Sequence, residues 1–241
     1  MFRAFPTAVL AIGPLLLAMH LMGCRQPEHD APQTSDNADP YAPDADLEPL
    51  IPMETGPVYH IIEGYDPKWP ELIREGVERA RDYWGSYGPT HVWIVGTDDG
   101  EPLGEATARA WLDEYCTWRT EDTDIPFDDC LEHAHGMFIE VVERGEPEAY
   151  LSEAREKQLR MAELVFINVQ EWYVPDEAIP DPILRGIHEY THVFQLSVGP
   201  MPTWMMEGGA VFTESWLAFL DGRRPLERNM RWIMERAQRI R

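Results

Sequence analysis

A short segment near the C-terminal end of the chain constrains its fold most tightly. Residues 188–192 have the sequence HEYTH, an HExxH pattern within a stretch, 182–196, of helical periodicity. Histidines four residues apart on a helix lie on one face, so His188 and His192 can both reach a single metal ion. Glu189 falls beside that face. The pattern therefore predicts a helix that packs one side against a core and presents the other to a metal.

The residues around the pattern support this helix. Asp181 suits an N-cap and Pro182 suits the first helical position. At about 100° per residue, four apolar side chains cluster roughly opposite the histidine pair. They are Ile183, Ile187, Tyr190 and Phe194.

A third protein ligand is expected, because catalytic zinc takes three and leaves one position for water. Fourteen residues separate His192 from Glu207, which suffices for the end of one helix, a turn at 197–200 and a returning helix over 204–219. Glu207 is the predicted third ligand. Glu214 lies on the same face of the second helix, and we expect it to orient a ligand histidine or to replace Glu207 as ligand.

Two further features bear on the second helix. Thr203 is its predicted N-cap. Gly208 and Gly209 have no side-chain bulk, so this turn can approach the first helix closely. Trp204 and Trp216 are expected in the core.

The paired motifs carry a family resemblance. HEYTH followed by WMMEGGA at 204–210 resembles the gluzincin metallopeptidases, especially the bacterial peptidase MA-like proteins, over about residues 164–220. The resemblance implies one Zn²⁺ per chain held by His188, His192 and Glu207. It implies that Glu189 is the catalytic base, activating a zinc-bound water to hydrolyse peptide bonds of a peptide or protein substrate.

The same resemblance assigns the strand 164–169 to the edge of a zincin sheet, where an extended substrate pairs. Many relatives also place a carbonyl-polarising Tyr or His downstream. None of the 27 residues after Glu214 is Tyr or His, so this role would fall to an upstream residue or to the metal alone.

The periodicity of the whole chain predicts an α+β fold with a C-terminal helical part. The resemblance implies that this fold is zincin-like, with a small mixed sheet and the HExxH helix. Strands are expected at 58–63, 91–96, 137–142 and 164–169. Helices are expected at 70–87, 104–118, 148–162, 182–196, 204–219 and 226–239.

The N-terminal segment resembles a bacterial lipoprotein signal. Residues 1–23 are mostly apolar and end in Leu-Met-Gly before Cys24. We expect lipid on Cys24, and an acidic, Pro-rich tether completing residues 24–56 ahead of a domain at 57–241. The protein would then sit in the bacterial cell envelope, on the outer membrane or cell surface more readily than the inner membrane. An ordinary signal peptide or an uncleaved anchor is the alternative.

The two remaining cysteines, Cys116 and Cys130, are predicted to form a disulfide, the usual state in an exported protein. It would close a loop of about 15 residues and contribute about 3 kcal/mol. The alternative uses Cys130 with His133 and His135 as a metal cluster.

The net charge of −23 argues against binding nucleic acid, whose partners need basic faces. We expect a monomer. Two functional alternatives stay open at this point. A non-catalytic surface lipoprotein could use the zinc-binding domain to bind partners, and the same site could hydrolyse a non-peptide amide.

Overall fold

A computed structural model describes residues 50–98, 102–121, 123–156, 159–175, 177–199, 201–227, 230–231 and 234–235. The fold is α+β, as the periodicity predicts. In chain order the elements are β1 (Ile51–Pro52), β2 (Val58–Ile61), α1 (Lys68–Trp84), β3 (Tyr87–Gly88), β4 (Thr90–Val95), α2 (Glu105–Thr120), α3 (Phe127–Ala134), a π-helical turn (His135–Ile139), α4 (Glu140–Arg144), β5 (Glu148–Glu156), β6 (Leu159–Ile167), a 3₁₀ turn (Val169–Trp172), α5 (Asp181–Val198) and α6 (Thr203–Leu220).

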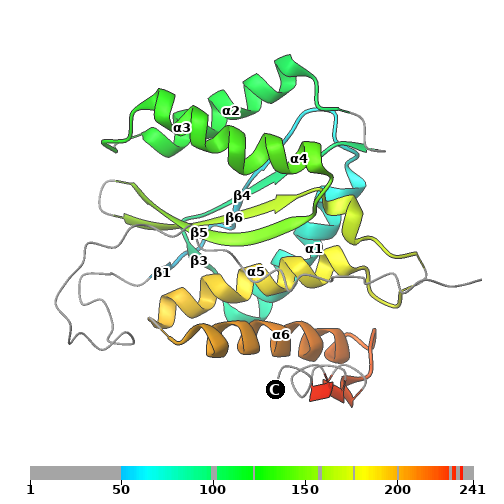
Figure 1. Ribbon diagram of the computed structural model, residues 1–241. Helices are drawn as coiled ribbons and strands as arrows, with labels where there is room; N and C mark the ends of the chain where they lie inside the picture. The colour runs from blue at the N-terminus through cyan, green and yellow to red at the C-terminus, as the bar shows by residue number, and fades with distance from the viewer. Residues whose placement is uncertain are drawn as a thin grey trace, which may run out of the picture.

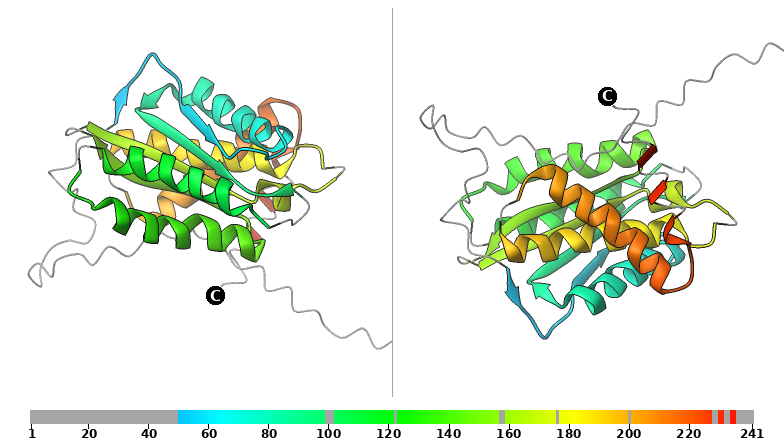
Figure 2. Two further views of the ribbon diagram at one scale, coloured as in Figure 1. Left: turned by 90° about the horizontal axis from the view of Figure 1, so that it is seen from above. Right: turned by 90° about the horizontal axis from the view of Figure 1, so that it is seen from below.

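These elements stack in layers (Figure 1). Helices α2, α3 and α4 cover one face of the main sheet, α1 and α5 cover the other, and α6 lies outside α5. The views from above and below show the same order (Figure 2). The layering buries α5 between the sheet and α6, and this is the helix that carries the HExxH pattern.

The main sheet is mixed, with strand order β2-β4-β6-β5. The first three strands are parallel, and β5 runs antiparallel to β6. Strand β6 therefore has a partner on each side, and Leu164–Ile167 are fully buried. The prediction that the strand at 164–169 is an edge strand is wrong, because β5 covers its free side.

For two segments the predicted type of secondary structure is wrong: one predicted helix is a strand, and one predicted strand is helical. The helix expected at 148–162 is instead β5 and the start of β6. The strand expected at 137–142 lies in the π-helical turn and α4. In both places packing overrides local propensity: the helix formers of β5 pair along the whole of β6, and the β-branched residues of α4 bury one helical face.

The helix expected at 226–239 can be judged only in part. Residues 226, 227, 230, 231, 234 and 235 are helical, and the others lie outside the described residues. Residues before Leu50, including Cys24, also lie outside them. Leu50 is buried and β1 pairs with β3, so folded structure begins before residue 57.

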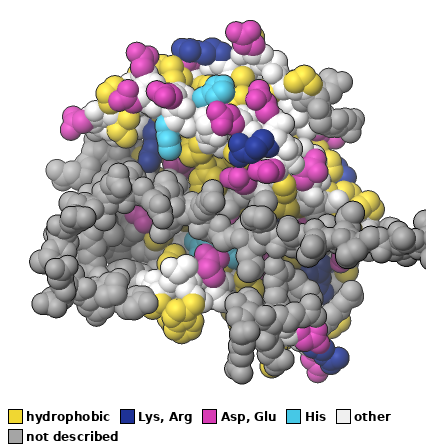
Figure 3. All heavy atoms as spheres, in the orientation of Figure 1, with side chains coloured by type: hydrophobic (Ala, Val, Ile, Leu, Met, Phe, Trp, Pro, Cys, Tyr) yellow, Lys and Arg dark blue, Asp and Glu magenta, His cyan; other side chains and the backbone are white. Residues whose placement is uncertain are grey.

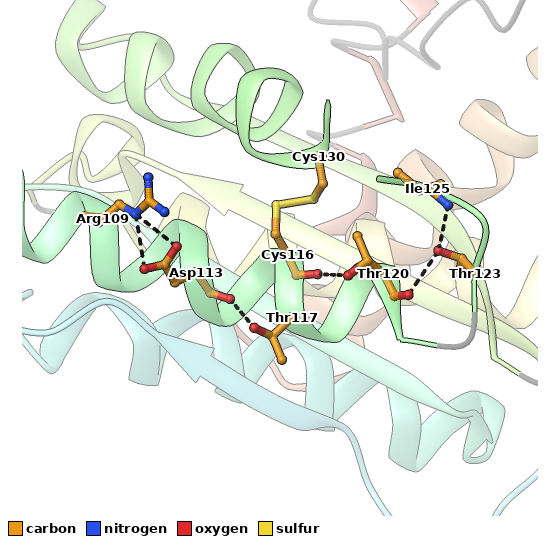
Figure 4. Close-up of a disulfide and its surroundings, with 8 residues drawn as sticks. All are labelled: Arg109, Asp113, Cys116, Thr117, Thr120, Thr123, Ile125 and Cys130. Carbon is orange, nitrogen blue, oxygen red and sulfur yellow. Dashed lines mark hydrogen bonds and ion pairs between the residues drawn. A yellow bond between two sulfur atoms is a disulfide. The ribbon is translucent and has the colours of Figure 1, made fainter. Parts of the chain in front are cut away.

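The layer of α2, α3 and α4 packs on the sheet through aromatic rings. Trp93 of β4 meets Trp111 and Tyr115 of α2 edge to face, at centroid distances of 5.3 and 5.0 Å. Cys116 of α2 and Cys130 of α3 form a disulfide (Figure 4), which confirms that prediction and removes Cys130 from any metal cluster. Acidic side chains spread over the outside of this layer (Figure 3).

On the other side, α1 and α5 cross in direct backbone contact. A Cβ on Gly76 would stand 2.1 Å from the Ile183 carbonyl oxygen, and one on Gly186 would stand 2.5 Å from that of Ile73. Only glycine fits at this crossing. Among the described helices, none combines the length and apolar character needed to cross a membrane.

Candidate metal centre

Helix α5 is fixed from several directions before it presents the site. Ile183 and Ile187 are buried, as the helical wheel predicts. Tyr190 donates a hydrogen bond to the Gly85 carbonyl at 3.0 Å and accepts one from the Tyr87 amide at 3.2 Å. These contacts fix the orientation of α5 about its own axis. They therefore also fix the direction in which its histidines point.

The predicted N-caps are wrong for both helices. Neither α5 nor α6 has a side-chain capping hydrogen bond, and the residue before each helix is a proline. Asp181 instead accepts a hydrogen bond from Arg185 at 3.4 Å, and Thr203 is the exposed first residue of α6. Proline supplies the extended backbone at each entry, so the helix can begin without a cap.

The turn between the helices brings α6 back beside α5. Helix α5 ends at Val198, and Gly199 follows with φ of 118°, a value that favours glycine. A Cβ on Gly209 would stand 2.8 Å from Nε2 of Gln195, whereas one on Gly208 would meet nothing within 4 Å. The predicted close approach therefore depends on Gly209 alone.

The structure brings His188, His192 and Glu207 together. Nε2 of His188 lies 3.4 Å from Oε2 of Glu207, and Nε2 of His192 lies 3.7 Å from Oε1 of the same carboxylate. The three possible ligand atoms all lie within 4.8 Å of one another. Both histidines are buried and Glu207 is about one-third exposed. The cluster therefore opens toward solvent on its α6 side.

The second nitrogen of each imidazole has its own partner. Nδ1 of His188 contacts a carboxylate oxygen of Glu214, as predicted. Nδ1 of His192 contacts Oε1 of Gln195 at 2.7 Å. Both partners accept hydrogen bonds, so each Nδ1 carries the proton and each Nε2 keeps its lone pair toward Glu207.

Gln195 was missed by the sequence analysis. Its Nε2 donates to the Met206 carbonyl at 2.9 Å, so one side chain links a histidine of α5 to the turn of α6 that precedes Glu207. Its position three residues after His192 was the available signal, since residues at that spacing are neighbours on a helix.

The donor set fits a transition metal. Two imidazole nitrogens and one carboxylate oxygen are typical zinc ligands, whereas calcium and magnesium prefer oxygen alone. Tetrahedral bonds of about 2.1 Å separate neighbouring ligand atoms by about 3.4 Å. The separations of 3.4 and 3.7 Å at Glu207 are close to that value. This buried group could bind a metal ion.

Glu189 is buried beside the cluster. Burial raises the pKa of Glu189 to about 7. The charge of Arg185, and that of His188 whenever its imidazole is protonated, opposes this rise in pKa, and Glu207 and Glu214 add to it. Desolvation disfavours the carboxylate form. A divalent cation held by the cluster would lower this pKa by its opposite charge.

A second buried glutamate shows that burial alone does not define the site. Glu163 of β6 is enclosed on the opposite face of the sheet, where burial raises its pKa against the opposing charge of Arg119. Oε2 of Glu163 lies 3.1 Å from the Ser152 hydroxyl and 3.7 Å from Arg119. No ring of metal ligands surrounds it among the described residues. What distinguishes Glu189 is the converging donor set beside it.

No protein-family model matches the chain, and no curated protein or solved structure is significantly similar to it.

Proposed function

We propose that the chain is a zinc metallopeptidase of the gluzincin type with a zincin-like fold. The observation that carries the proposal is the convergence of His188, His192 and Glu207, with each histidine oriented through Nδ1 and a buried glutamate alongside. Donors oriented in this way can hold one Zn²⁺ per chain. Glu189 is the proposed catalytic base.

Each residue then has a defined task. His188, His192 and Glu207 would hold the metal, which when bound supplies a Lewis acid that polarises a carbonyl group. Glu189 accepts a proton from the attacking water and returns it to the leaving nitrogen as the C–N bond breaks. Glu214 and Gln195 hold the two imidazoles in the required tautomer and direction.

In this proposal β5, rather than the strand at 164–169, is the edge strand with which an extended substrate pairs. It pairs only with β6 in the described sheet, and α5 contacts it. An extended peptide can add to the open side of such a strand through main-chain hydrogen bonds. This assignment supports a peptide or protein substrate over a small non-peptide amide.

The proposal includes an envelope location, in which residues 1–23 are removed and Cys24 carries lipid. Labelled palmitate fed to a bacterium that expresses the full chain should appear on the wild type and be absent from Cys24→Ser. Equal labelling of the two would exclude lipid on Cys24.

Metal analysis tests the site. Purified wild-type chain should hold about one zinc, and Glu207→Ala should lose it because only two ligands remain. Glu132→Ala, an exposed position on α3, is the control and should keep the metal. A wild type that takes up no zinc, or a Glu207→Ala variant that binds it as tightly, contradicts the proposal.

Hydrolysis of a peptide library tests the reaction. Glu189→Gln keeps the size of the side chain and removes its base, so cleavage should fall by at least about a hundredfold while zinc stays bound. Equal cleavage by wild type and variant would falsify the role of Glu189. Zinc without cleavage by the wild type favours a non-catalytic zinc-binding lipoprotein that uses this domain to bind partners.

A further inference from the structure

One side of α6 is covered along the end of the helix but open at its first turn. At about 100° per residue, Trp204 lies about 60° around the helix axis from Glu207. Ser215 and Ala218 lie in the same direction, at about 80° and 20°. They are 4% and 0% exposed, whereas Trp204 is 74% exposed. The expectation that Trp204 lies in the core is therefore wrong, whereas Trp216 is partly buried against the core.

This open turn lies next to the metal cluster. Three residues of helix advance by about 4.5 Å, so Trp204 is about one turn from the ligand Glu207. Glu207 is the partly exposed member of the cluster, and both histidines are buried. Figure 3 shows hydrophobic side chains at the surface where α6 begins. A molecule that reaches the metal from solvent on the α6 side therefore comes within reach of the Trp204 indole.

The first turn of α6 is held in place, so Trp204 has a fixed position relative to the cluster. The Met206 amide donates a hydrogen bond to the Pro202 carbonyl at 3.1 Å. The Met206 carbonyl accepts one from Gln195, whose other end contacts His192. The indole of Trp204 has no hydrogen bond or ring contact within the part of the chain that the structure describes. A large aromatic surface is thus presented to solvent on a rigid support beside the metal centre.

The surroundings of Trp204 favour apolar groups over charged ones. Residues 199–206 are GPMPTWMM, a run without any charged side chain in a chain that is 26% charged. An indole offers a large apolar surface and packs well against other aromatic rings. A basic or acidic side chain would find no opposite charge in this segment. An aromatic or large aliphatic group therefore matches this surface best.

We propose that Trp204 determines substrate specificity: its indole forms the wall of a subsite for a large apolar side chain, aromatic above all, of an extended peptide. The inference rests on the proposed function, because the metal centre fixes where the peptide lies. An extended chain advances about 3.3 Å per residue. The helical rise of about 4.5 Å between Glu207 and Trp204 therefore corresponds to a side chain within about two residues of the cleaved bond.

Binding of peptide hydroxamates to the zinc-loaded full chain tests the subsite without turnover. The probes are matched pairs that carry phenylalanine or alanine at one of the two positions on either side of the metal-binding group. Wild type should bind the phenylalanine form of at least one pair at least about tenfold more tightly, because that side chain leaves water for the indole surface. Trp204→Ala should bind both forms of each pair equally, and Trp204→Phe should keep most of the preference.

Cleavage of a peptide library extends the test to turnover. The bonds that wild type cuts should be enriched in aromatic and large aliphatic residues within two positions of the cleaved bond. In Trp204→Ala, kcat/KM should fall at least about tenfold for a peptide with phenylalanine at the selected position and stay unchanged for its alanine counterpart. A purely structural role of Trp204 would lower both values together.

Phe212→Ala is the matched control. Phe212 is an exposed aromatic residue of the same helix, but it lies about 140° around the axis from Glu207. Its removal should leave the preference for phenylalanine over alanine as in wild type. Zinc content and thermal melts of each variant show that the metal and the fold are retained.

Two results would overturn the inference. One is a wild type that holds zinc and binds both forms of every hydroxamate pair equally. The other is a folded Trp204→Ala variant that keeps the preference for phenylalanine. A chain that holds no zinc contradicts the proposed function as well, and metal analysis detects that case separately. Zinc with the phenylalanine preference but without cleavage contradicts the proposed reaction alone.

Discussion

Helices α5 and α6 form the metal centre together, but they are held in different ways. Each has 18 residues; thirteen are buried in α5 and only five in α6. Helix α5 contacts α1, the sheet and α6, whereas the main partner of α6 is α5. The two histidines therefore belong to the core, and Glu207 belongs to a helix attached from one side. Contact with a metal ion would tie the second helix to the first.

The largest expected effect concerns the backbone crossing that holds α5. Gly186→Ala should lower the free energy of unfolding by about 3 kcal/mol or more, because its Cβ would meet the Ile73 carbonyl and α1 must move. Gly208→Ala on α6 should raise stability by about 0.5–1 kcal/mol, since nothing lies near that Cβ and alanine favours helix. Urea unfolding measures both changes.

Equal losses in the two variants would contradict the difference between the helices. Gly186 lies two residues before His188, so the zinc content of any folded Gly186→Ala protein shows whether the crossing also positions the histidines. The Gly208→Ala protein should keep its zinc.

The two helices were also the part of the fold most fully predicted from sequence. Their expected ranges, 182–196 and 204–219, lie within α5 and α6. Long helices with a clear apolar face have a strong periodic signal, and the spacing of an HExxH pattern fixes the direction of its side chains. Glu207 could be predicted as a ligand because a short turn limits which residues of the returning helix can lie beside the two histidines.

Other features depend on contacts that a single sequence does not display. Residues 148–156 contain good helix formers, and only pairing with β6 makes them a strand. This error also changed the expected substrate-binding strand, because β5, and not the strand at 164–169, lies at that edge of the sheet. The exposure of Trp204 was also unpredictable, since aromatic side chains in helices usually pack in cores.

A second prediction tests the link between the helices. Gln195→Leu should weaken zinc binding by about 10–100-fold, because Nδ1 of His192 and the Met206 carbonyl both lose their partner. Gln195→Glu keeps an acceptor for His192 and should recover part of the affinity. Competition with a fluorescent chelator gives the dissociation constants.

The control for that experiment is Gln170→Leu, in the 3₁₀ turn before α5, which removes the oxygen that accepts a hydrogen bond from the Tyr65 hydroxyl. It should leave zinc affinity unchanged. A Gln195→Leu chain that binds zinc as tightly as wild type would show that His192 needs no such support.

The opposite face of the sheet provides a comparison without a metal centre. Burial raises the pKa of Glu163, so the folded chain holds this proton more tightly than the unfolded chain does. Wild type should therefore lose stability as pH rises from the ordinary glutamate pKa through the raised one. Glu163→Gln cannot ionise, and it should be more stable than wild type at pH 7 by about 1 kcal/mol, with little difference near pH 4.

Thermal melts across that pH range measure the effect. A Glu163→Gln protein that is less stable than wild type at pH 7 would mean that the Arg119 pair contributes more than the buried charge costs. Ser152→Ala, which removes a hydrogen bond to the same carboxylate, should increase the pH dependence of stability.

The smallest expected effect concerns the contact that joins the end of α6 to α1. Arg79 makes a two-pronged ion pair with Asp221, at 2.9–3.0 Å, between residues that are each about one-quarter exposed. Asp221→Asn should cost about 0.5–1 kcal/mol, and less at high salt, because water and ions screen a partly exposed pair. Asp113→Asn breaks an exposed pair within α2 and should cost less. Since the Asp221 pair ties α6 rather than α5, its loss should speed amide hydrogen exchange in α6 and leave α5 protected; equal acceleration in both helices would mean that they open as one unit.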